Sequence, residues 1–251
     1  MKITSVNNDL IKETAKLLRS KYRDESGLFL VEGMKGIEEA IDAKLEIVHL
    51  FVQQNLPPHL NPLPLGEEII CEVTEPILAK ISDAKTPPKA VAVVKQPKYK
   101  WSEKFKKVVL LEGIKDPGNL GTILRSASAF GIDALVLYGD TVDLYNPKCV
   151  RSTVGNLWKI PVFKMSDLSI FANYERIATL PKGVNGVTVI PLKSYKPTEK
   201  ILVMFGSEAD GLSEELKNFA TKNITIEMGA NVESLNLSVS ASIIMYELFN
   251  K

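Results

Sequence analysis

Histidine and cysteine are scarce in this chain of 251 residues, which contains two of each. The cysteines, Cys71 and Cys149, are too few for a disulfide framework or a cysteine-rich zinc site, and we expect each to be a small buried apolar residue. Both histidines, His49 and His59, lie in the first quarter of the chain. The other three quarters therefore offer no histidine as a metal ligand or general base, and we expect no metal in a site formed there.

The chain also lacks a long apolar run and an excess of either charge. Residues 1–20 are too polar for a signal peptide, and no apolar stretch approaches membrane-spanning length. The 31 basic and 30 acidic residues give a formal net charge of +1, so attraction over the whole molecule cannot hold a nucleic acid. With 45% hydrophobic residues, we predict a cytoplasmic protein of one large or two small domains that does not contact membranes.

Two common nucleotide-binding motifs are missing. The chain has no GxGxxG, the fingerprint of a dinucleotide-binding fold. A P-loop requires lysine and then serine or threonine after its second glycine. Gly113 and Gly118 have the correct spacing, but Asn119 and Leu120 follow them. The glycine turn before Asn119 therefore needs another explanation.

Apolar runs alternate with helical patterns in two parts of the chain, which predicts two α/β domains, the second with a mainly parallel sheet. We place the first domain at residues 1–97, a polar, lysine-rich linker at 98–106 and the second domain at 107–251. Within the first domain, residues 10–24 combine leucines with five basic residues. This pattern predicts one amphipathic, basic helix.

The glycine turn leads from the apolar run at 108–111 into a predicted helix at 119–130. Wound at about 100° per residue, this helix buries one side and leaves Arg125 almost opposite that side. The spacing alone favours an ordinary solvated arginine. The turn at Gly118, with the amide of Asn119 beside the free N–H groups of a helix start, raises the odds of an anion contact a little.

A second glycine turn, FGSEADGLS at 205–213, again follows a strand pattern and precedes a helix pattern. Gly206 and Gly211 would let the backbone approach a ligand closely. We expect Glu208 at the carboxyl end of a strand, where open α/β sheets bind their ligands. For Glu208 taken alone, a carboxylate bonded to local N–H groups is the better explanation.

The third segment, ESLNLSVSAS at 233–242, opens the last predicted helix, 236–249. Ser234 and Asn236 are polar groups at a helix start that we expect to be buried. Apolar residues surround the helix almost completely, which predicts burial on all sides. We therefore expect a homodimer that packs through this helix.

These three segments, in this order, resemble the three motifs of the SpoU (TrmH-type) RNA 2′-O-ribose methyltransferases within the SPOUT superfamily. The first of them reads DPGNLGTILRSASAFG, and NPKCVRSTVGNLWKIPV at 146–162 resembles the family's segment between the first and second motifs. The resemblance spans roughly residues 108–249. The segment IKETAKLLRSKYRDESGLFLVEG makes the first domain similar to the family's L30e-like substrate-binding domain, although this likeness is looser.

The resemblance implies a C-terminal SPOUT α/β domain with a deep trefoil knot, an exception to the rule against knots. S-adenosylmethionine would be the cofactor and would lie in the knot, which accounts for the missing GxGxxG. The residues that the family match assigns to this cofactor, largely through backbone groups, are Thr179, Gly206, Ile226, Met228 and Leu235.

The resemblance also implies which residues carry the reaction. The five matching positions are Arg125, Asn119, Glu208, Ser234 and Asn236. The family's arginine is proposed to take a proton from the ribose 2′-hydroxyl, but a free guanidinium stays protonated far above neutral pH. We therefore expect Arg125 to hold the adjacent phosphate and orient the hydroxyl.

The substrate implied is RNA, most readily ribosomal RNA of the 23S type, because an L30e-like first domain resembles the ribosomal members. The basic residues expected to contact RNA are Lys12, Lys16, Arg19, Arg23 and Arg151, although a solvated helix face explains the first four about equally well. A tRNA methyltransferase and a catalytically inactive RNA-binding protein are the alternatives. Glu227 and Ala209 depart from the family's usual proline and glycine.

Overall fold

The structure is a computed structural model that describes residues 1–54, 69–181, 187–229 and 234–249. His59 lies outside these ranges. The chain divides into two compact units. The first consists of Met1–Lys98 and Asp143–Trp158, and the second of Tyr99–Val142 and Lys159–Lys251. The chain therefore enters the second unit, returns to the first for one short segment, and enters the second again.

The first unit is built on a mixed five-stranded sheet with the order β1-β4-β3-β5-β2. β1, β4 and β3 pair in parallel, and β5 pairs antiparallel with both β3 and β2. Its core includes the fully buried side chains of Ile11, Phe51 and Ile77. The elements of this unit are β1 (Lys2–Ile3), α1 (Asp9–Lys16), α2 (Ser20–Ser26), β2 (Leu28–Glu32), α3 (Met34–Asp42), β3 (Ile47–Gln53), β4 (Ile70–Val73), α4 (Glu75–Lys80), β5 (Ala90–Lys95) and α6 (Pro147–Ser152).

The single helix predicted at residues 10–24 is wrong, because two helices occupy this stretch. α1 ends at Lys16, and Arg19 has an extended backbone with φ −105° and ψ 134° before α2 begins. The break turns Arg23 inward, where its guanidinium donates a hydrogen bond of 2.7 Å to the carbonyl of Leu17. Leu17 is the C-cap of α1, so Arg23 satisfies a carbonyl that the end of a helix leaves without a partner.

Arg23 is therefore buried rather than part of the expected basic surface. Only 2% of its side chain is exposed, and it forms an ion pair with Asp143, to which its Nε donates at 2.7 Å. A buried guanidinium that already has a carboxylate partner cannot also contact an RNA phosphate without breaking that pair. The expectation that Arg23 faces RNA is corrected to a structural role.

We predict that Arg23→Met lowers the free energy of unfolding by about 3–5 kcal/mol, because it leaves Asp143 and the Leu17 carbonyl without their partner. Urea denaturation of the full chain would measure the change. Arg19→Met is the matched control: Arg19 is exposed, and its replacement should change stability by about 0.5 kcal/mol or less. Equal losses in the two variants would contradict the assignment.

Residues 143–158 pack within the first unit, although we predicted a second domain at 107–251. The rings of Phe29 and Tyr145 have centroids 4.7 Å apart, and the Trp158 indole donates to the Glu39 carbonyl at 3.0 Å. The segment thus belongs by its contacts to the unit that carries the substrate-domain resemblance, while its neighbours in sequence belong to the other.

Arg151, in α6, binds two carboxylates of the first unit. Its Nη1 donates to Glu32 Oε2 at 3.0 Å and also pairs with Asp83. The Glu32 side chain is only 2% exposed, and burial raises the pKa of this carboxyl above its ordinary value, while Ser82 and Arg151 act in the opposite direction. The structure thus gives Arg151 an intramolecular role, which weakens the expectation that it contacts RNA.

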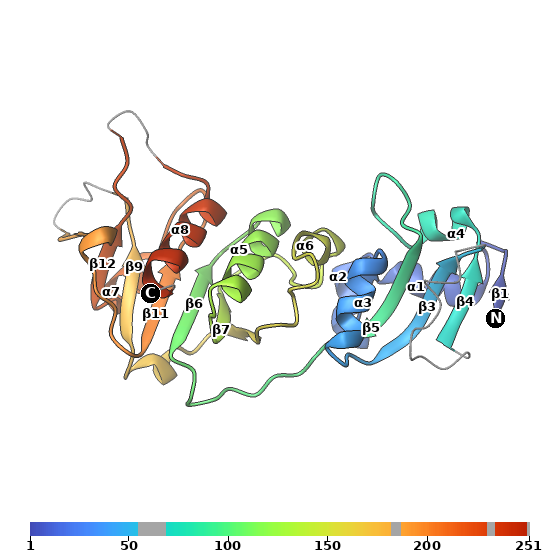
Figure 1. The fold of residues 1–251 in the computed structure, drawn as a ribbon, viewed down its shortest axis with the longest axis horizontal. Coiled ribbons are helices and arrows are strands. Elements are labelled where there is room, and N and C mark those ends of the chain that lie inside the picture. Colours follow the sequence, from blue (N-terminus) through green and yellow to red (C-terminus); the bar gives the residue numbers. More distant parts are fainter. Residues whose placement is uncertain (55–68, 182–186, 230–233, 250–251) are drawn as a thin grey trace. The chain divides into compact units, whose positions relative to one another are not determined.

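The second unit contains the predicted parallel sheet. Its seven strands have the order β10-β12-β9-β11-β6-β7-β8, and every pair is parallel. The helices α5 and α8 lie side by side (Figure 1). The elements are β6 (Lys107–Glu112), α5 (Pro117–Ala129), β7 (Ala134–Tyr138), β8 (Val162–Met165), η3 (Ser169–Phe171), β9 (Glu175–Thr179), β10 (Ile190–Pro191), η4 (Leu192–Ser194), β11 (Ile201–Phe205), α7 (Glu214–Phe219), β12 (Lys222–Thr225) and α8 (Leu237–Phe249).

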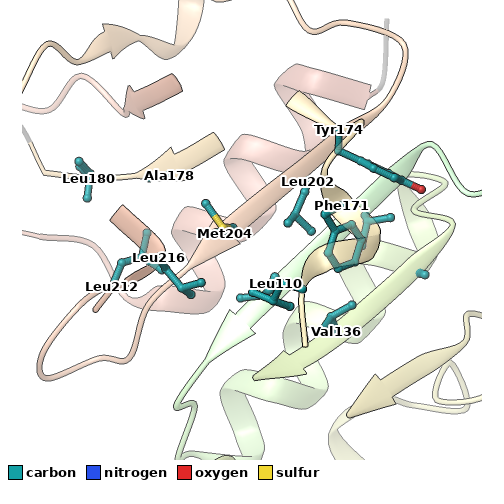
Figure 2. Packing of buried hydrophobic residues seen from close by; sticks show 13 residues of the cluster. Leu110, Val136, Phe171, Tyr174, Ala178, Leu180, Leu202, Met204, Leu212 and Leu216 are labelled. Atoms are coloured by element: carbon teal, nitrogen blue, oxygen red, sulfur yellow. The ribbon is translucent and has the colours of Figure 1, made fainter. Parts of the chain in front are cut away.

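The central strands of this sheet are buried along their length. All five residues of β11 are buried, and so are residues 108–111 of β6. Figure 2 shows part of the core on one face, where Leu110, Met204 and Phe171 are among the packed side chains. Burial on both faces explains why these strands are continuous apolar runs rather than alternating ones. The rigid centre of the sheet fixes the positions of the loops that follow β6 and β11.

Candidate active site

The first site residue lies where β6 ends and α5 begins. Asp116 caps α5, because its carboxylate accepts a hydrogen bond of 2.9 Å from the backbone N–H of Gly118. Asn119 follows in the first turn of the helix, and only 8% of its surface is exposed. A side-chain amide this deeply buried needs hydrogen-bond partners in the protein.

Glu208 lies in the loop that follows β11, the strand beside β6. Phe205 pairs in register with Leu111, so the carboxyl ends of the two strands reach the same edge of the sheet. Ser207 and Gly211 exchange two backbone hydrogen bonds of 3.1 Å, which close the loop between them. This closed loop presents Glu208 at the edge of the sheet, where α/β folds bind their ligands.

Asn236 immediately precedes α8. Its Oδ1 accepts hydrogen bonds from the backbone N–H of Ser238 at 2.9 Å and from the Ser238 hydroxyl at 2.6 Å, so it caps the start of the helix. Further along, the hydroxyl oxygens of Ser126 in α5 and Ser242 in α8 are 2.7 Å apart. The packing of α8 on α5 brings Asn236 next to Asn119.

Two hydrogen bonds join these three segments into one chain. The Nδ2 of Asn119 donates to Glu208 Oε1 at 2.8 Å, and the Nδ2 of Asn236 donates to Asn119 Oδ1 at 3.1 Å. The first motif is thereby bonded to the second, 89 positions away, and to the third, 117 positions away. The structure brings together three of the five residues that the resemblance assigns to the reaction.

The other two residues, Arg125 and Ser234, are not part of this series of hydrogen bonds. Arg125 is exposed on α5, whereas Leu120, Ile123 and Leu124 are fully buried, which confirms the helical face read from the sequence. Within the described ranges, the Arg125 guanidinium has no hydrogen-bond or ion-pair partner. It is therefore a cation available to an anion. Ser234 and Asn236 are exposed as well, so the expectation that these two residues are buried is wrong.

A cavity of about 690 Å³ lies at the carboxyl edge of the sheet. It is lined by residues at the ends of β9, β11 and β12 and in the loops that follow them, by apolar residues around the start of α8, and by Ser234, Asn236 and Glu208. The hydroxyl of Thr179 donates a hydrogen bond of 2.9 Å to the Met204 carbonyl, so this hydroxyl can only accept a further hydrogen bond from a ligand. All five residues predicted to bind the cofactor line this one cavity: Thr179, Gly206, Ile226, Met228 and Leu235.

A second cavity, of about 770 Å³, shares the 207–212 loop with the first. Asn119 and Glu208 line it, together with Glu112, whose Oε2 accepts from the Ser213 N–H at 2.8 Å. Lys115 pairs with Asp140 at 2.5 Å and holds the pKa of that carboxyl below its usual value. The Asn119–Glu208 hydrogen bond thus lies at the boundary of the two cavities.

Sequence reasoning missed two charged pairs at these cavities. Lys217 lines the first cavity and pairs with Glu214 at 2.8 Å. Lys217 lies in α7, one helical turn after the second motif, and its position in the helix pattern that follows this motif was the only signal available. The pairing of Lys115 with Asp140 joins two separate loops, which no local pattern predicts.

The basic residues that remain candidates for RNA contact lie in α1 and just before α2. Lys12 pairs with Asp9 at 3.0 Å and Lys16 with Glu13 at 2.6 Å, and both lysines are exposed. Arg19 is exposed as well. These local ion pairs are between solvated groups, so they cost little to exchange for a phosphate.

No group of three or more histidine, cysteine, aspartate or glutamate side chains is arranged to hold a metal ion in the part of the chain that the structure describes. Across the same residues, no helix combines the length and the apolar character needed to cross a membrane.

Comparison with known proteins gives the same two-part picture. Residues 106–246 match the family model of the SpoU rRNA methylases, and residues 8–92 match the MRM3-like substrate-binding domain. A 23S rRNA (guanosine(2553)-2′-O)-methyltransferase, RlmP from Bacillus subtilis, is 30% identical over 247 residues, which are 98% of each chain.

Two solved structures are similar over nearly the whole chain. An AdoMet-bound rRNA methyltransferase from Sinorhizobium meliloti aligns with a TM-score of 0.86 and 26% identity, covering 98% of this chain and 96% of that one. The SpoU methyltransferase AviRb from Streptomyces viridochromogenes, in complex with AdoMet, aligns with a TM-score of 0.84 and 25% identity, covering 96% and 97%. The likeness therefore includes both units.

Proposed function

Because the chain belongs to the SpoU rRNA methylase family, we propose that it transfers a methyl group from S-adenosylmethionine to a ribose 2′-hydroxyl of ribosomal RNA. The observation that carries this proposal is the hydrogen-bonded chain of Glu208, Asn119 and Asn236 at the wall of the 690 Å³ cavity. These three residues come one from each motif. The protein therefore retains the polar groups that an inactive relative would be free to lose.

The residues around the first cavity fit S-adenosylmethionine. Apolar residues in its lining, such as Leu235 and Ile226, suit the adenosine part. The lining carries two carboxylates, Glu208 and Asp210, against one ammonium, Lys217, and this acidic balance suits a sulfonium cation. When bound, S-adenosylmethionine supplies a methyl group that leaves its sulfur for the ribose oxygen, while the hydroxyl proton is released.

The protein's own contribution is positioning. Arg125 would hold the phosphate beside the target ribose, since a guanidinium binds phosphate through paired hydrogen bonds and keeps its proton near neutral pH. Glu208 and Asn119, at the boundary of the two cavities, would orient the ribose against the methyl donor. Such positioning supplies much of the rate of a transfer between two bound substrates.

A methyl-transfer assay tests the proposal. The purified protein, with labelled S-adenosylmethionine, should label ribosomal RNA in vitro, and the label should be recovered in alkali-resistant dinucleotides because a methylated 2′-oxygen cannot attack the next phosphate. Label found in bases, or in tRNA and not in ribosomal RNA, would overturn the proposed substrate. The match to the SpoU rRNA methylase family and the 23S rRNA methyltransferase among the relatives favour ribosomal RNA over tRNA.

We further propose the deep trefoil knot of the SPOUT fold for residues 107–251. It is supported by the all-parallel strand order of the second unit and by the likeness to AviRb over 96% of the chain. We also propose a cytoplasmic location, because a ribosomal RNA substrate would be met there.

We propose a homodimer through α8. The sequence predicted an apolar helix buried on all sides, and the structure leaves one face of it uncovered. Val239, Ile243 and Tyr246 are 46%, 39% and 54% exposed, and their spacing puts them on one stripe of the helix. A second copy of this chain would cover the stripe, as in the common isologous dimer.

We predict that the double variant Ile243→Asp with Tyr246→Asp is a monomer while the wild type is a dimer, because two charges in an apolar interface lose their hydration without gaining partners. Light scattering at micromolar concentration would measure both masses. Lys222→Asp, at an exposed residue of β12, is the control and should remain dimeric. A monomeric wild type would rule out the proposed dimer.

We predict that the triple variant of Lys12, Lys16 and Arg19 to alanine raises the apparent KM for RNA and reduces the slope of log affinity against log salt. Each lost phosphate contact should lower that slope by about 0.7–0.9. Filter binding at several salt concentrations would measure it, with affinity for S-adenosylmethionine unchanged as the control. An unchanged slope would instead identify this surface as a solvated helix face.

A further inference from the structure

The side-chain amide of Asn236 has only one orientation that satisfies the start of α8. The atom that faces the helix receives the backbone N–H groups of Ser238 at 2.9 Å and Val239 at 3.3 Å, and the Ser238 hydroxyl at 2.6 Å. A backbone N–H can only donate a hydrogen bond, so this atom must be the oxygen. The nitrogen of Asn236 must therefore point away from the helix.

This orientation determines that of the next two side chains. The Asn236 nitrogen donates at 3.1 Å, so the atom of Asn119 that meets it must be the oxygen. Asn119 then turns its own nitrogen to Glu208, 2.8 Å away, and an ionised carboxylate can only accept. Both ends of this series of hydrogen bonds impose the same donor-to-acceptor direction. One end consists of the N–H donors of the helix start and the other end of a carboxylate acceptor, so no two acceptors meet.

Burial differs along this chain of hydrogen bonds: Asn119 and Ser238 are buried, whereas Asn236 is exposed. Asn119 is 8% exposed and Ser238 is 6% exposed, whereas Glu208 is exposed and lines both cavities. Within the described ranges, the second carboxylate oxygen of Glu208 has no hydrogen-bond partner. The chain thus holds one oxygen of Glu208 and leaves the other as an acceptor at the boundary between the cavities.

We propose that Ser238 and the start of α8 position the reacting groups: they hold Asn236, Asn119 and Glu208 in a single hydrogen-bonding direction and so orient the open oxygen of Glu208 toward a hydroxyl of the target ribose. Ser238 is a positioning residue that does not touch the substrate. The identity of the hydroxyl rests on the proposed function, but the direction of the chain does not.

A double-mutant cycle tests the direction without any assay of activity. Asn236→Asp keeps a good helix cap but presents a carboxylate to Asn119. Whichever way Asn119 then turns, one of its contacts joins two acceptors. Glu208→Gln alone is mild, since the Gln oxygen still accepts from Asn119. In the Asn236→Asp background it becomes stabilising, because the Gln nitrogen donates to Asn119 and the whole chain reverses.

We expect the unfolding constants to show a coupling of about tenfold between positions 208 and 236, which do not bond to each other directly. Urea denaturation of the wild type, the two single variants and the double variant would measure it. The double variant should be more stable than Asn236→Asp alone, because the reversed direction leaves no two acceptors in contact. Additive effects, within about twofold, would overturn the proposed direction.

Ser238→Ala tests the positioning role in the reaction. We expect kcat for RNA methylation to fall about tenfold, equivalent to about 1.4 kcal/mol in the barrier, because the loss of the Ser238 hydroxyl loosens the side chains that orient Glu208. KM for RNA and calorimetric affinity for S-adenosylmethionine should be unchanged. Thr122→Ala is the control, because among the described residues the Thr122 hydroxyl bonds only to the Gly118 carbonyl of its own helix.

The outcomes separate the two proposals. A wild type that methylates no RNA contradicts the proposed function. The double-mutant cycle would still test the direction of the hydrogen bonds, because it measures stability and not activity. Unchanged kcat in Ser238→Ala, or equal losses in Ser238→Ala and Thr122→Ala, would overturn the positioning role even if the cycle shows coupling. A loss of kcat confined to Ser238→Ala, together with the coupling, supports it.

Discussion

Arg125→Ala is expected to reduce RNA methylation by roughly 10²-fold, the loss that follows when a bound substrate is misplaced by about 1 Å. Arg125 is exposed on α5 and opposite the buried face of that helix, so alanine creates no cavity and removes no partner. The free energy of unfolding should change by about 0.5 kcal/mol or less. Affinity for S-adenosylmethionine should be unchanged, because Arg125 does not line the first cavity.

Single-turnover methyl transfer, denaturation and calorimetry on the same preparation would measure these quantities. Lys222→Ala removes an equally exposed cation of the second unit and should behave as the wild type. Arg125→Lys should remain impaired, because an ammonium cannot reproduce the paired contacts of a guanidinium with phosphate. Wild-type turnover in Arg125→Ala, or its unfolding, would refute the role proposed for Arg125.

The sequence was sufficient for the parts of the fold that local periodicity controls. The apolar runs of β6 and β11 are buried on both faces, so they were continuous and easy to recognise. The position of Arg125 followed from the 3.6-residue period of α5. The strand β8 (Val162–Met165), at one edge of the sheet, cannot be recognised in this way, because its three half-buried residues and the exposed Lys164 form neither an apolar run nor a clear alternation.

Long-range polar contacts were the parts that the sequence could not predict. Arg23 was assigned to an exposed basic face because its neighbours in sequence are basic, but its partner Asp143 lies 120 positions away. Arg151 likewise binds Glu32, 119 positions away. A charge pattern along a helix indicates which residues can be solvated, and it does not indicate which of them meets a carboxylate from elsewhere in the chain.

The candidate site shows the same division. The family resemblance assigned Asn119, Glu208 and Asn236 to one site, and the structure joins them through two hydrogen bonds. Their direction could not be read from the motifs. It depends on the backbone N–H groups of Ser238 and Val239. These groups can donate to Asn236 because the first turn of a helix gives them no carbonyl partner within the helix.

Gly206→Ala is expected to have the other large effect, on folding and on the cofactor cavity together. A Cβ at position 206 would lie 1.9 Å from the carbonyl carbon of Gly211 and 2.1 Å from the backbone nitrogen of Leu212. These are backbone atoms, which cannot rotate away as the tip of a side chain can. The loop must therefore open to make room for the methyl group. Overpacking in a typical core lowers the free energy of unfolding by about 1–3 kcal/mol. We expect the loss in Gly206→Ala to be at or above about 3 kcal/mol, because the atoms in the way are backbone.

Affinity for S-adenosylmethionine should fall at least about tenfold for each 1.4 kcal/mol of loop distortion, because Gly206 and Gly211 both line the first cavity. Gly229→Ala is the matched control. Gly206 and Gly229 both lack a positive φ, so alanine is acceptable to the backbone at both positions. Among the residues that the structure describes, a Cβ at Gly229 would meet nothing within 4 Å. Urea denaturation and calorimetry of the two variants would isolate the effect of space alone. If Gly206→Ala bound the cofactor as tightly as Gly229→Ala, the closed 206–212 loop would not be the wall that shapes the site.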